Sequence, residues 1–407
     1  MKFIDGGVCA AKGFKAAGVH VGVKTHADWK KDVALIVSDT TCAAAGVFTK
    51  NVVKAAPVLV DIARLKNGVA RAVIANSGNA NACAPHGEEY AERMCAAAAK
   101  VIGCTPEEVL VSSTGVIGQT LNIAAIEDGM QGLYDALASS PEASDAAAHA
   151  IMTTDTVKKE AAVETVVDGK TVRLGGVAKG SGMIHPNMGT MLCFLTTDCA
   201  ISAAMIRTAL LETAEVSFNR ISVDGDTSTN DSCMVLANGL AGNAEITAKG
   251  ADYDAFLEAL QALCVKLARD MASDGEGAKH LITCTVNGAE SVKSAETIAK
   301  SVISSTLMKA AIFGADANWG RALCAMGYSG ETFDPDKVNV SFASAAGEIE
   351  VCANGRGLDF DEDKAKKILT EHDIEIRITM GEGGAACTCW GCDITYDYIK
   401  INGDYRT

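Results

Sequence analysis

Hydrophobic positions along the chain follow two periods, the two-residue period of β-strands and the 3.6-residue period of α-helices. Segments rich in β-branched and aliphatic residues, bounded by polar or glycine-containing turns, predict strands. Asp168 and Gly169 stand between two β-branched runs, which indicates a β-hairpin. The expected strands are 32–39, 69–78, 190–198, 337–344, 348–355 and 374–380.

Helical periodicity is clearest at 253–272, where seven apolar residues form one stripe. Further helices are expected at 88–103, ending at Gly103, at 294–314 as one helix ending at Gly314, and at 361–372. Thr105, Pro106 and Glu108 form the sequence signature of a capped helix start.

The mixture of hairpins and helices predicts a layered α/β fold, with mixed sheets inside and helices outside. The sequence does not show the strict alternation of strand and helix that is typical of an all-parallel sheet. A chain of 407 residues exceeds the usual size of one domain, so two main domains are expected.

Composition excludes several classes of function. The net charge of −15 argues against broad nucleic-acid binding, which needs a surplus of lysine and arginine. No apolar run approaches the ~20 residues of a membrane span, and the start of the chain has no apolar signal segment. The fifteen cysteines are scattered through apolar segments, as expected of free thiols in a reducing compartment. These features predict a soluble cytoplasmic protein.

Three motifs resemble ligand sites but lack required residues. In "GVAKGSGM" (176–183) Lys179 precedes Gly180, so a phosphate loop is not expected. The loop 224–231 lacks the glycine and the final glutamate of a calcium site. Cys387, Cys389 and Cys392 are three thiols without a nearby fourth ligand, which favours packed thiols over zinc. We therefore expect no metal.

The stretch "HPNMGTMLCFLTTD" (185–198) contains a different candidate chemistry. Threonine is a nucleophile when an amine accepts its proton, and an N-terminal threonine supplies that amine itself. Thr190 would become such a residue if the chain broke after Gly189, where the small glycine leaves the carbonyl accessible. From this stretch alone the simpler interpretation, a threonine opening a strand, is favoured because threonine is common in strands.

A series of motifs along the whole chain favours the interpretation of Thr190 as a nucleophile. The segment "AKGSGMIHPNMGTMLCFLTTD" resembles the processing site of the ornithine acetyltransferase family, also called glutamate N-acetyltransferase. The resemblance extends over essentially the whole chain, with motifs in the same order. These motifs are "GGVCAAKGFKAAGVHVGVK", "GVFTKN", "NSGNANAC", "SSTGVIG", "MTTDT", "SVDGDTSTND", "SDGEGA", "GADANWGR" and "YDYIKINGDYRT".

The resemblance implies an N-terminal-nucleophile-like fold and a precursor that cuts itself between Gly189 and Thr190. The fragments 1–189 and 190–407 would stay together as α and β chains, in an α2β2 heterotetramer. Thr190 would take an acetyl group from N-acetylornithine, release ornithine and pass the acetyl group to glutamate. This ping-pong reaction recycles the acetyl group in arginine biosynthesis and needs no cofactor.

The resemblance also implies roles for individual residues. Thr114 and Gly115 would form the oxyanion hole. The substrate-binding residues would be Thr153, Lys179, Thr190, Glu276, Asn402 and Thr407. Lys179 suits a substrate carboxylate, and Glu276 suits an ammonium group.

Two points stay open at the level of sequence. Some family members also use acetyl-CoA as a donor, and no residue here decides whether this chain does. A related N-terminal-nucleophile amidase or aminopeptidase is the alternative function. The family usually has alanine before the nucleophile, so Gly189 is expected to affect the rate and completeness of cleavage.

Overall fold

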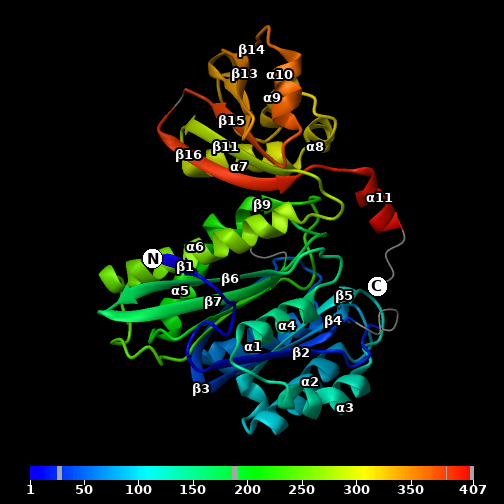
Figure 1. The fold of residues 1–407 in the computed structure, drawn as a ribbon, viewed down its shortest axis with the longest axis vertical. Helices are drawn as coiled ribbons and strands as arrows, with labels where there is room; N and C mark the ends of the chain where they lie inside the picture. Colours follow the sequence, from blue (N-terminus) through cyan, green and yellow to red (C-terminus); the bar gives the residue numbers. More distant parts are fainter. Residues whose placement is uncertain (25–29, 186–190, 382, 404–407) are drawn as a thin grey trace.

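The computed structural model describes residues 1–24, 30–185, 191–381 and 383–403. Two β-sheets with helices packed on their faces form the molecule, and the smaller sheet lies above the larger one in Figure 1. The predicted layered α/β fold with mixed sheets is therefore confirmed. The smaller sheet has a buried hydrophobic cluster of its own, and a second cluster contains residues of both sheets.

The larger sheet has nine strands. Its order is β1-β6-β7-β8-β10-β3-β4-β5, with β2 paired to β3. The strands are β1 (Lys2–Ile4), β2 (Phe14–Val19), β3 (Val33–Phe48), β4 (Val69–Asn79), β5 (Val109–Val116), β6 (Lys159–Val167), β7 (Lys170–Lys179), β8 (Leu192–Thr197) and β10 (Ser232–Ala237).

Strand β8 lies in the middle of this sheet, antiparallel to β7 and parallel to β10. Its side chains alternate between two cores, as the two-residue period requires. Leu192 and Phe194 pack on one face, and Cys193 and Leu195 on the other. The proposed break after Gly189 falls between β7 and β8. Both fragments would therefore contribute strands to one sheet.

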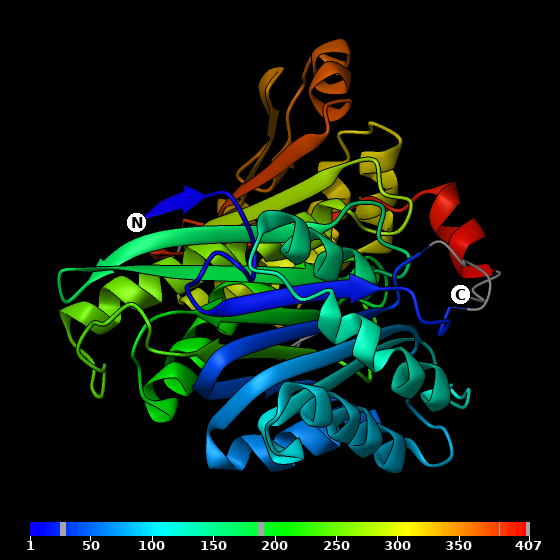
Figure 2. The ribbon, with the colours of Figure 1, turned by 60° about the horizontal axis from the view of Figure 1, so that its bottom comes forward.

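Helices cover both faces of the larger sheet (Figures 1 and 2). Helices α2 and α3 pack on one face of β3, β4 and β5, and α4 packs on the opposite face. Helices α5 and α6 cover β7, β8 and β10. The six helices of this half are α1 (Ala56–Arg64), α2 (Gly87–Ile102), α3 (Ile123–Asp135), α4 (Pro141–Ile151), α5 (Ala203–Val216) and α6 (Ala251–Ser273).

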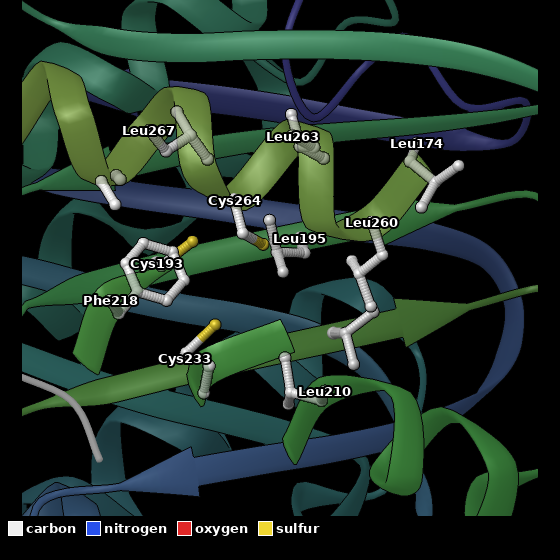
Figure 3. Packing of buried hydrophobic residues seen from close by; sticks show 14 of the residues in the cluster. Leu174, Cys193, Leu195, Leu210, Phe218, Cys233, Leu260, Leu263, Cys264 and Leu267 are labelled. Atoms are coloured by element: carbon white, nitrogen blue, oxygen red, sulfur yellow. The ribbon is translucent and has the colours of Figure 1, made fainter. Parts of the chain in front are cut away.

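The apolar stripe predicted on 253–272 is the buried face of α6, and Figure 3 shows how it packs. Leu260, Leu263 and Leu267 point toward the sheet, where Leu195 lies among them. Three cysteines, Cys193, Cys233 and Cys264, are buried in the same core. All fifteen cysteines are free thiols in the structure.

The smaller sheet has seven strands. Their order is β14-β13-β12-β15-β11-β16-β9. The strands are β9 (Ile221–Ser222), β11 (Leu281–Ala289), β12 (Asn339–Ser344), β13 (Gly347–Ala353), β14 (Arg356–Gly357), β15 (Asp373–Thr379) and β16 (Ala385–Cys392). The helices of this half are α7 (Val292–Ser304), α8 (Thr306–Phe313), α9 (Trp319–Gly327), α10 (Glu362–Leu369) and α11 (Tyr396–Gly403).

Two helix predictions were wrong in detail. The capping box at Thr105 is present, but it opens a single 3-10 turn, Pro106–Glu108, that leads directly into β5. The expected helix 294–314 is two helices, because Ser305 adopts an extended backbone and caps α8 by accepting a hydrogen bond from Met308 N at 3.3 Å. A polar residue that bonds its own backbone competes with continuous helix.

The three cysteines of "CTCWGC" do not converge. Cys387 and Cys389 face the core of the smaller sheet, whereas Cys392 faces the core that contains α6. The alternation of side chains along β16 causes this separation. Within the described ranges, no helix combines the length and the apolar character needed to cross a membrane.

Candidate active site

A cavity of about 350 Å³ lies where the ends of β5, β7 and β8 meet the segment that precedes β10. Its volume is in the range of small-molecule sites. Its wall consists of Ala80, Thr114, Gly115, Val116, Ile117, Thr153, Thr154, Lys179, Gly180, Gly182, Met183, Ile184, Met191, Leu192, Ser228, Thr229, Asn230, Asp231, Glu276 and Asn402.

Six of the predicted site residues line this one cavity, although they come from five separate parts of the chain. They are Thr114, Gly115, Thr153, Lys179, Glu276 and Asn402. Gly189, Thr190 and Thr407 lie outside the described residues. Met191, which follows Thr190 directly, is part of the wall.

Thr114 and Gly115 stand at the end of β5, next to the end of β4. Gly115 has φ +131°, and a β-carbon there would lie 2.3 Å from the carbonyl carbon of Gly78. Only glycine fits this close approach of two backbones. The Thr114 hydroxyl oxygen accepts a hydrogen bond from Lys179 Nζ at 3.5 Å, so its own proton can be donated into the cavity.

Lys179 is the last residue of β7 and is 7 % exposed. Its ammonium group lies 3.9 Å from Oδ2 of Asp155. Burial lowers the pKa of Lys179, and nearby Lys159 lowers it further, while Asp155 and Glu276 favour the charged form. An additional carboxylate at this wall would stabilise the ammonium form.

Asp155 is fully buried and is held by several donors. Lys159 Nζ lies 2.5 Å from Oδ1, and the backbone amides of Thr153 and Gly180 donate to this carboxylate at 3.0 and 2.8 Å. Burial alone would raise the pKa of Asp155, but Lys159 and Lys179 hold it below its ordinary value. Asp155 therefore fixes the backbone of two predicted substrate-binding segments.

Lys159 also pairs with Asp274, at 2.5 Å. The Asp274 carboxylate accepts hydrogen bonds from the backbone amides of Thr156, at 3.0 Å, and Val157, at 3.3 Å. The backbone carbonyl oxygen of Asp274 accepts a hydrogen bond from the Ser181 hydroxyl at 2.6 Å. We call the group formed by Lys159, Asp155 and Asp274 the buried ion triad. The triad joins the segments 153–159, 179–181 and 274–276.

Glu276 comes two residues after Asp274 of the triad, just beyond the end of α6, and lines the cavity. Its backbone amide donates to Ser181 O at 2.9 Å, and its Oε2 accepts from Asn402 Nδ2 at 2.7 Å. A β-carbon on Gly182 would lie 2.3 Å from the Glu276 carboxyl carbon. Helix α11, which carries Asn402, extends from the smaller sheet toward the ends of the β4 and β5 strands (Figure 1).

Sequence reasoning missed the triad and two residues of the motif "STND". Asn230 Nδ2 donates to Ala80 O at 2.6 Å and Ser113 O at 2.8 Å, which fixes the start of β10 against the Thr114 segment. Asp231 lines the cavity and is 1 % exposed. One signal was available: Lys159 falls on the buried side of the alternation in β6, where a lysine needs carboxylate partners.

The layered fold and the cavity define an α/β protein with a small-molecule site that has both an ammonium and a carboxylate group in its wall. The family follows from the sequence. The ArgJ family matches residues 15–407, and the chain belongs to that family.

The chain is similar to several individual proteins. The arginine biosynthesis bifunctional protein ArgJ of Symbiobacterium thermophilum is 50 % identical over 408 aligned residues, covering 100 % of both chains. A crystal structure of arginine biosynthesis bifunctional protein ArgJ from Bacillus halodurans shares 41 % identity with a TM-score of 0.49, covering 52 % of this chain and 97 % of the other. An ornithine acetyltransferase complexed with ornithine, from Mycobacterium tuberculosis, shares 40 % identity with a TM-score of 0.43, covering 46 % of this chain and 98 % of the other.

The buried ion triad yields a prediction about stability. Lys159→Met leaves two buried carboxylates without their shared cation, which typically costs about 3–5 kcal/mol. Urea unfolding should show that loss of free energy of unfolding. The matched control is Lys266→Met, which breaks an exposed pair with Asp270 and should cost less than about 1 kcal/mol. Equal effects of the two substitutions would contradict the role of the triad.

His185 gives a prediction about pH. Burial lowers its pKa from 6.5 to about 4, and Lys300 acts in the same direction. The neutral imidazole therefore contributes stability above pH 6.5 that is lost as the pH falls toward 4. Between pH 7 and pH 5 the wild type should lose about 1–2 kcal/mol more than His185→Gln. Parallel pH profiles of unfolding free energy would show that His185 is not buried in this way.

Proposed function

We propose that this chain is an arginine-biosynthesis enzyme that transfers an acetyl group from N-acetylornithine to glutamate through Thr190. The observation that carries the proposal is the convergence of Thr114, Gly115, Lys179 and Glu276 on one cavity. Met191, the residue that directly follows Thr190 in the chain, is in the wall of this cavity. Both substrates are amino acids, which a pocket with opposite charges can recognise.

Self-cleavage would create the nucleophile. The Thr190 hydroxyl attacks the carbonyl of Gly189, the acyl group moves from nitrogen to oxygen, and water hydrolyses the ester. The chains 1–189 and 190–407 remain associated. The pairing of β7 with β8 and the ion pair between Lys159 and Asp274 both cross this boundary and support the association.

In the transfer reaction the freed α-amine of Thr190 takes the proton of its own hydroxyl. The hydroxyl oxygen attacks the acetyl carbonyl, and Thr114 and the Gly115 amide donate to the developing oxyanion. The carbon–nitrogen bond of N-acetylornithine then breaks, and the ammonium returns its proton to the departing amine of ornithine. The glutamate amine attacks the acetyl ester in turn, loses a proton, and releases the Thr190 hydroxyl. Lys179 pairs with the substrate carboxylate and Glu276 with an ammonium group. Thr153, Asn402 and Thr407 complete substrate binding. Acetyl-CoA stays an alternative acetyl donor, and the proposed reaction needs no cofactor.

Thr114→Val tests the oxyanion hole, because valine keeps the shape and removes the hydroxyl. Loss of one such donor typically lowers kcat about 10²–10³-fold. The KM for N-acetylornithine should change much less. Steady-state kinetics of the purified two-chain enzyme measures both. A rise in KM without a fall in kcat would place Thr114 in substrate binding instead.

The identity of the acceptor separates transfer from hydrolysis. Purified protein is incubated with N-acetylornithine, with and without glutamate, and ornithine, acetate and N-acetylglutamate are measured. The proposal predicts sustained ornithine release only with glutamate, with equal amounts of N-acetylglutamate. Sustained ornithine and acetate release without glutamate would instead identify an amidase.

A further inference from the structure

The motifs "NSGNANAC" (76–83) and "STND" (228–231) meet beside the candidate oxyanion hole, although the proposed chemistry uses no residue of either motif. The first motif spans the end of β4, and the second directly precedes β10. Four of their asparagines are buried, namely Asn76, Asn79, Asn81 and Asn230. A buried amide group is costly unless it is hydrogen-bonded, so the partners of these side chains indicate what they hold in place.

The backbone pairing between β4 and β5 is irregular where it reaches Thr114 and Gly115. The parallel register continues up to the pair Gly78 and Gly115, and it shifts at Asn79. The positive φ of Gly115 and its close approach to Gly78 occur at the same point. Regular sheet pairing therefore does not by itself fix the directions of the Thr114 side chain and the Gly115 amide.

The side-chain amide of Asn230 bridges the two strand ends at this irregular place. Its Nδ2 donates to Ala80 O at 2.6 Å, just beyond the end of β4, and to Ser113 O at 2.8 Å, within β5. Its Oδ1 accepts a hydrogen bond from the Thr229 hydroxyl at 2.6 Å. The reverse orientation of the amide would turn Oδ1 toward two carbonyl oxygens, so these partners define which way the amide points.

Asn76 holds Ser113 through a second set of hydrogen bonds. The Ser113 hydroxyl donates to Asn76 Oδ1 at 2.7 Å, and Asn76 Nδ2 donates to Asn79 O at 2.9 Å. We call Asn76, Ser113 and Asn230 the amide clamp. All three residues are at most 8 % exposed, so water competes little for these bonds. The peptide bond that joins Ser113 to Thr114 is therefore held by one asparagine from each motif.

We propose that Asn230 is a positioning residue of the oxyanion hole. Its amide fixes the peptide plane that precedes Thr114, and it thereby aims the Thr114 hydroxyl and the Gly115 amide at the developing oxyanion. This inference rests on the proposed function, because it requires Thr114 and Gly115 to donate to an oxyanion. Asn230 does not touch the reacting atoms in this role, since its Nδ2 already donates to two backbone carbonyls.

The chemistry of an oxyanion hole explains why such a clamp matters. The donors stabilise the transition state only if they point at the developing charge before the reaction begins. A displacement of about 1 Å can lower the rate about 10²-fold. Aspartate has nearly the shape of asparagine but no N–H donor, and at position 230 it would turn an oxygen toward two carbonyl oxygens. Asn230→Asp should therefore release the Ser113 carbonyl.

The test compares Asn230→Asp with the matched control Asn243→Asp. Asn243 is also buried, and its Nδ2 donates to Ala200 O at 3.0 Å and Ala244 O at 2.7 Å, but it is not among the described residues of the cavity wall. With N-acetylornithine and glutamate, Asn230→Asp should lower the kcat of the purified two-chain enzyme about 10–100-fold and change KM less than about threefold. Asn243→Asp should keep the kcat of the wild type.

A double-mutant cycle with Thr114→Val gives the readout that a purely structural role would not change. If Asn230 acts through the Thr114 hydroxyl, its substitution has less to disturb once that hydroxyl is absent. The kcat of the double variant should therefore exceed the product of the two separate effects by about fivefold or more. A variant that is only less well folded would lose the same factor in both backgrounds.

Ser113→Ala keeps the test decisive if Asn230→Asp does not fold or does not cut itself. This substitution removes only the hydroxyl that bonds to Asn76. It should lower kcat about 2–10-fold, the factor that corresponds to one ordinary hydrogen bond. This loss should also become smaller in the Thr114→Val background, and an unchanged loss there would overturn the inference.

The possible results separate this inference from the proposed function. If the wild type transfers no acetyl groups, or if Thr114→Val keeps its kcat, the proposed function of the site fails and the inference fails with it. If the wild type is active and Thr114→Val is slow, three results overturn the inference alone. They are equal kcat values of Asn230→Asp and Asn243→Asp, losses that multiply in the cycle, and a rise in KM without a fall in kcat.

Discussion

The buried ion triad is the interaction on which the candidate site depends. Lys159 has no exposed side-chain surface and is shared by Asp155 and Asp274, each of which also accepts backbone amide hydrogen bonds. A buried carboxylate is tolerated only when it is paired and hydrogen-bonded, so these bonds fix the surrounding backbone. The three segments fixed in this way carry Thr153, Lys179 and Glu276. Buried charge therefore helps to position the site.

The same triad connects the two halves of the proposed precursor. Asp155 and Lys159 belong to 1–189, and Asp274 belongs to 190–407. Together with the pairing of β7 and β8 inside one sheet, this gives a physical reason for two fragments to stay associated after a break at Gly189. Under the proposed mechanism, the break falls in the connection between β7 and β8, which are neighbouring strands of one sheet.

Much of the fold could be predicted from local patterns. The hairpin at Asp168 and the buried stripe on α6 were predictable because each depends on neighbours in sequence. The break at Ser305 was missed because a serine that caps a new helix has the same apolar flanks as a serine inside one. The single turn after Thr105 was missed because a capping box specifies a start and not a length.

The candidate site could be predicted only through family motifs. Thr114, Lys179, Glu276 and Asn402 lie far apart in sequence, and no periodicity indicates that they share a cavity. The residues that fix the segments of Lys179 and Glu276 are charged residues that composition alone would place at the surface. They are Asp155, Lys159 and Asp274. Asp231 was missed for the same reason, since its burial depends on the pairing of β8 with β10.

The central claim is that Thr190 becomes an N-terminal residue that carries the acetyl group. Intact mass measured after incubation with N-acetylornithine alone tests this claim most directly. The account predicts fragments 1–189 and 190–407, with one acetyl group on the second fragment, located at Thr190 and removed when glutamate is added. An uncut active chain, or an acetyl group on any other residue, would contradict it.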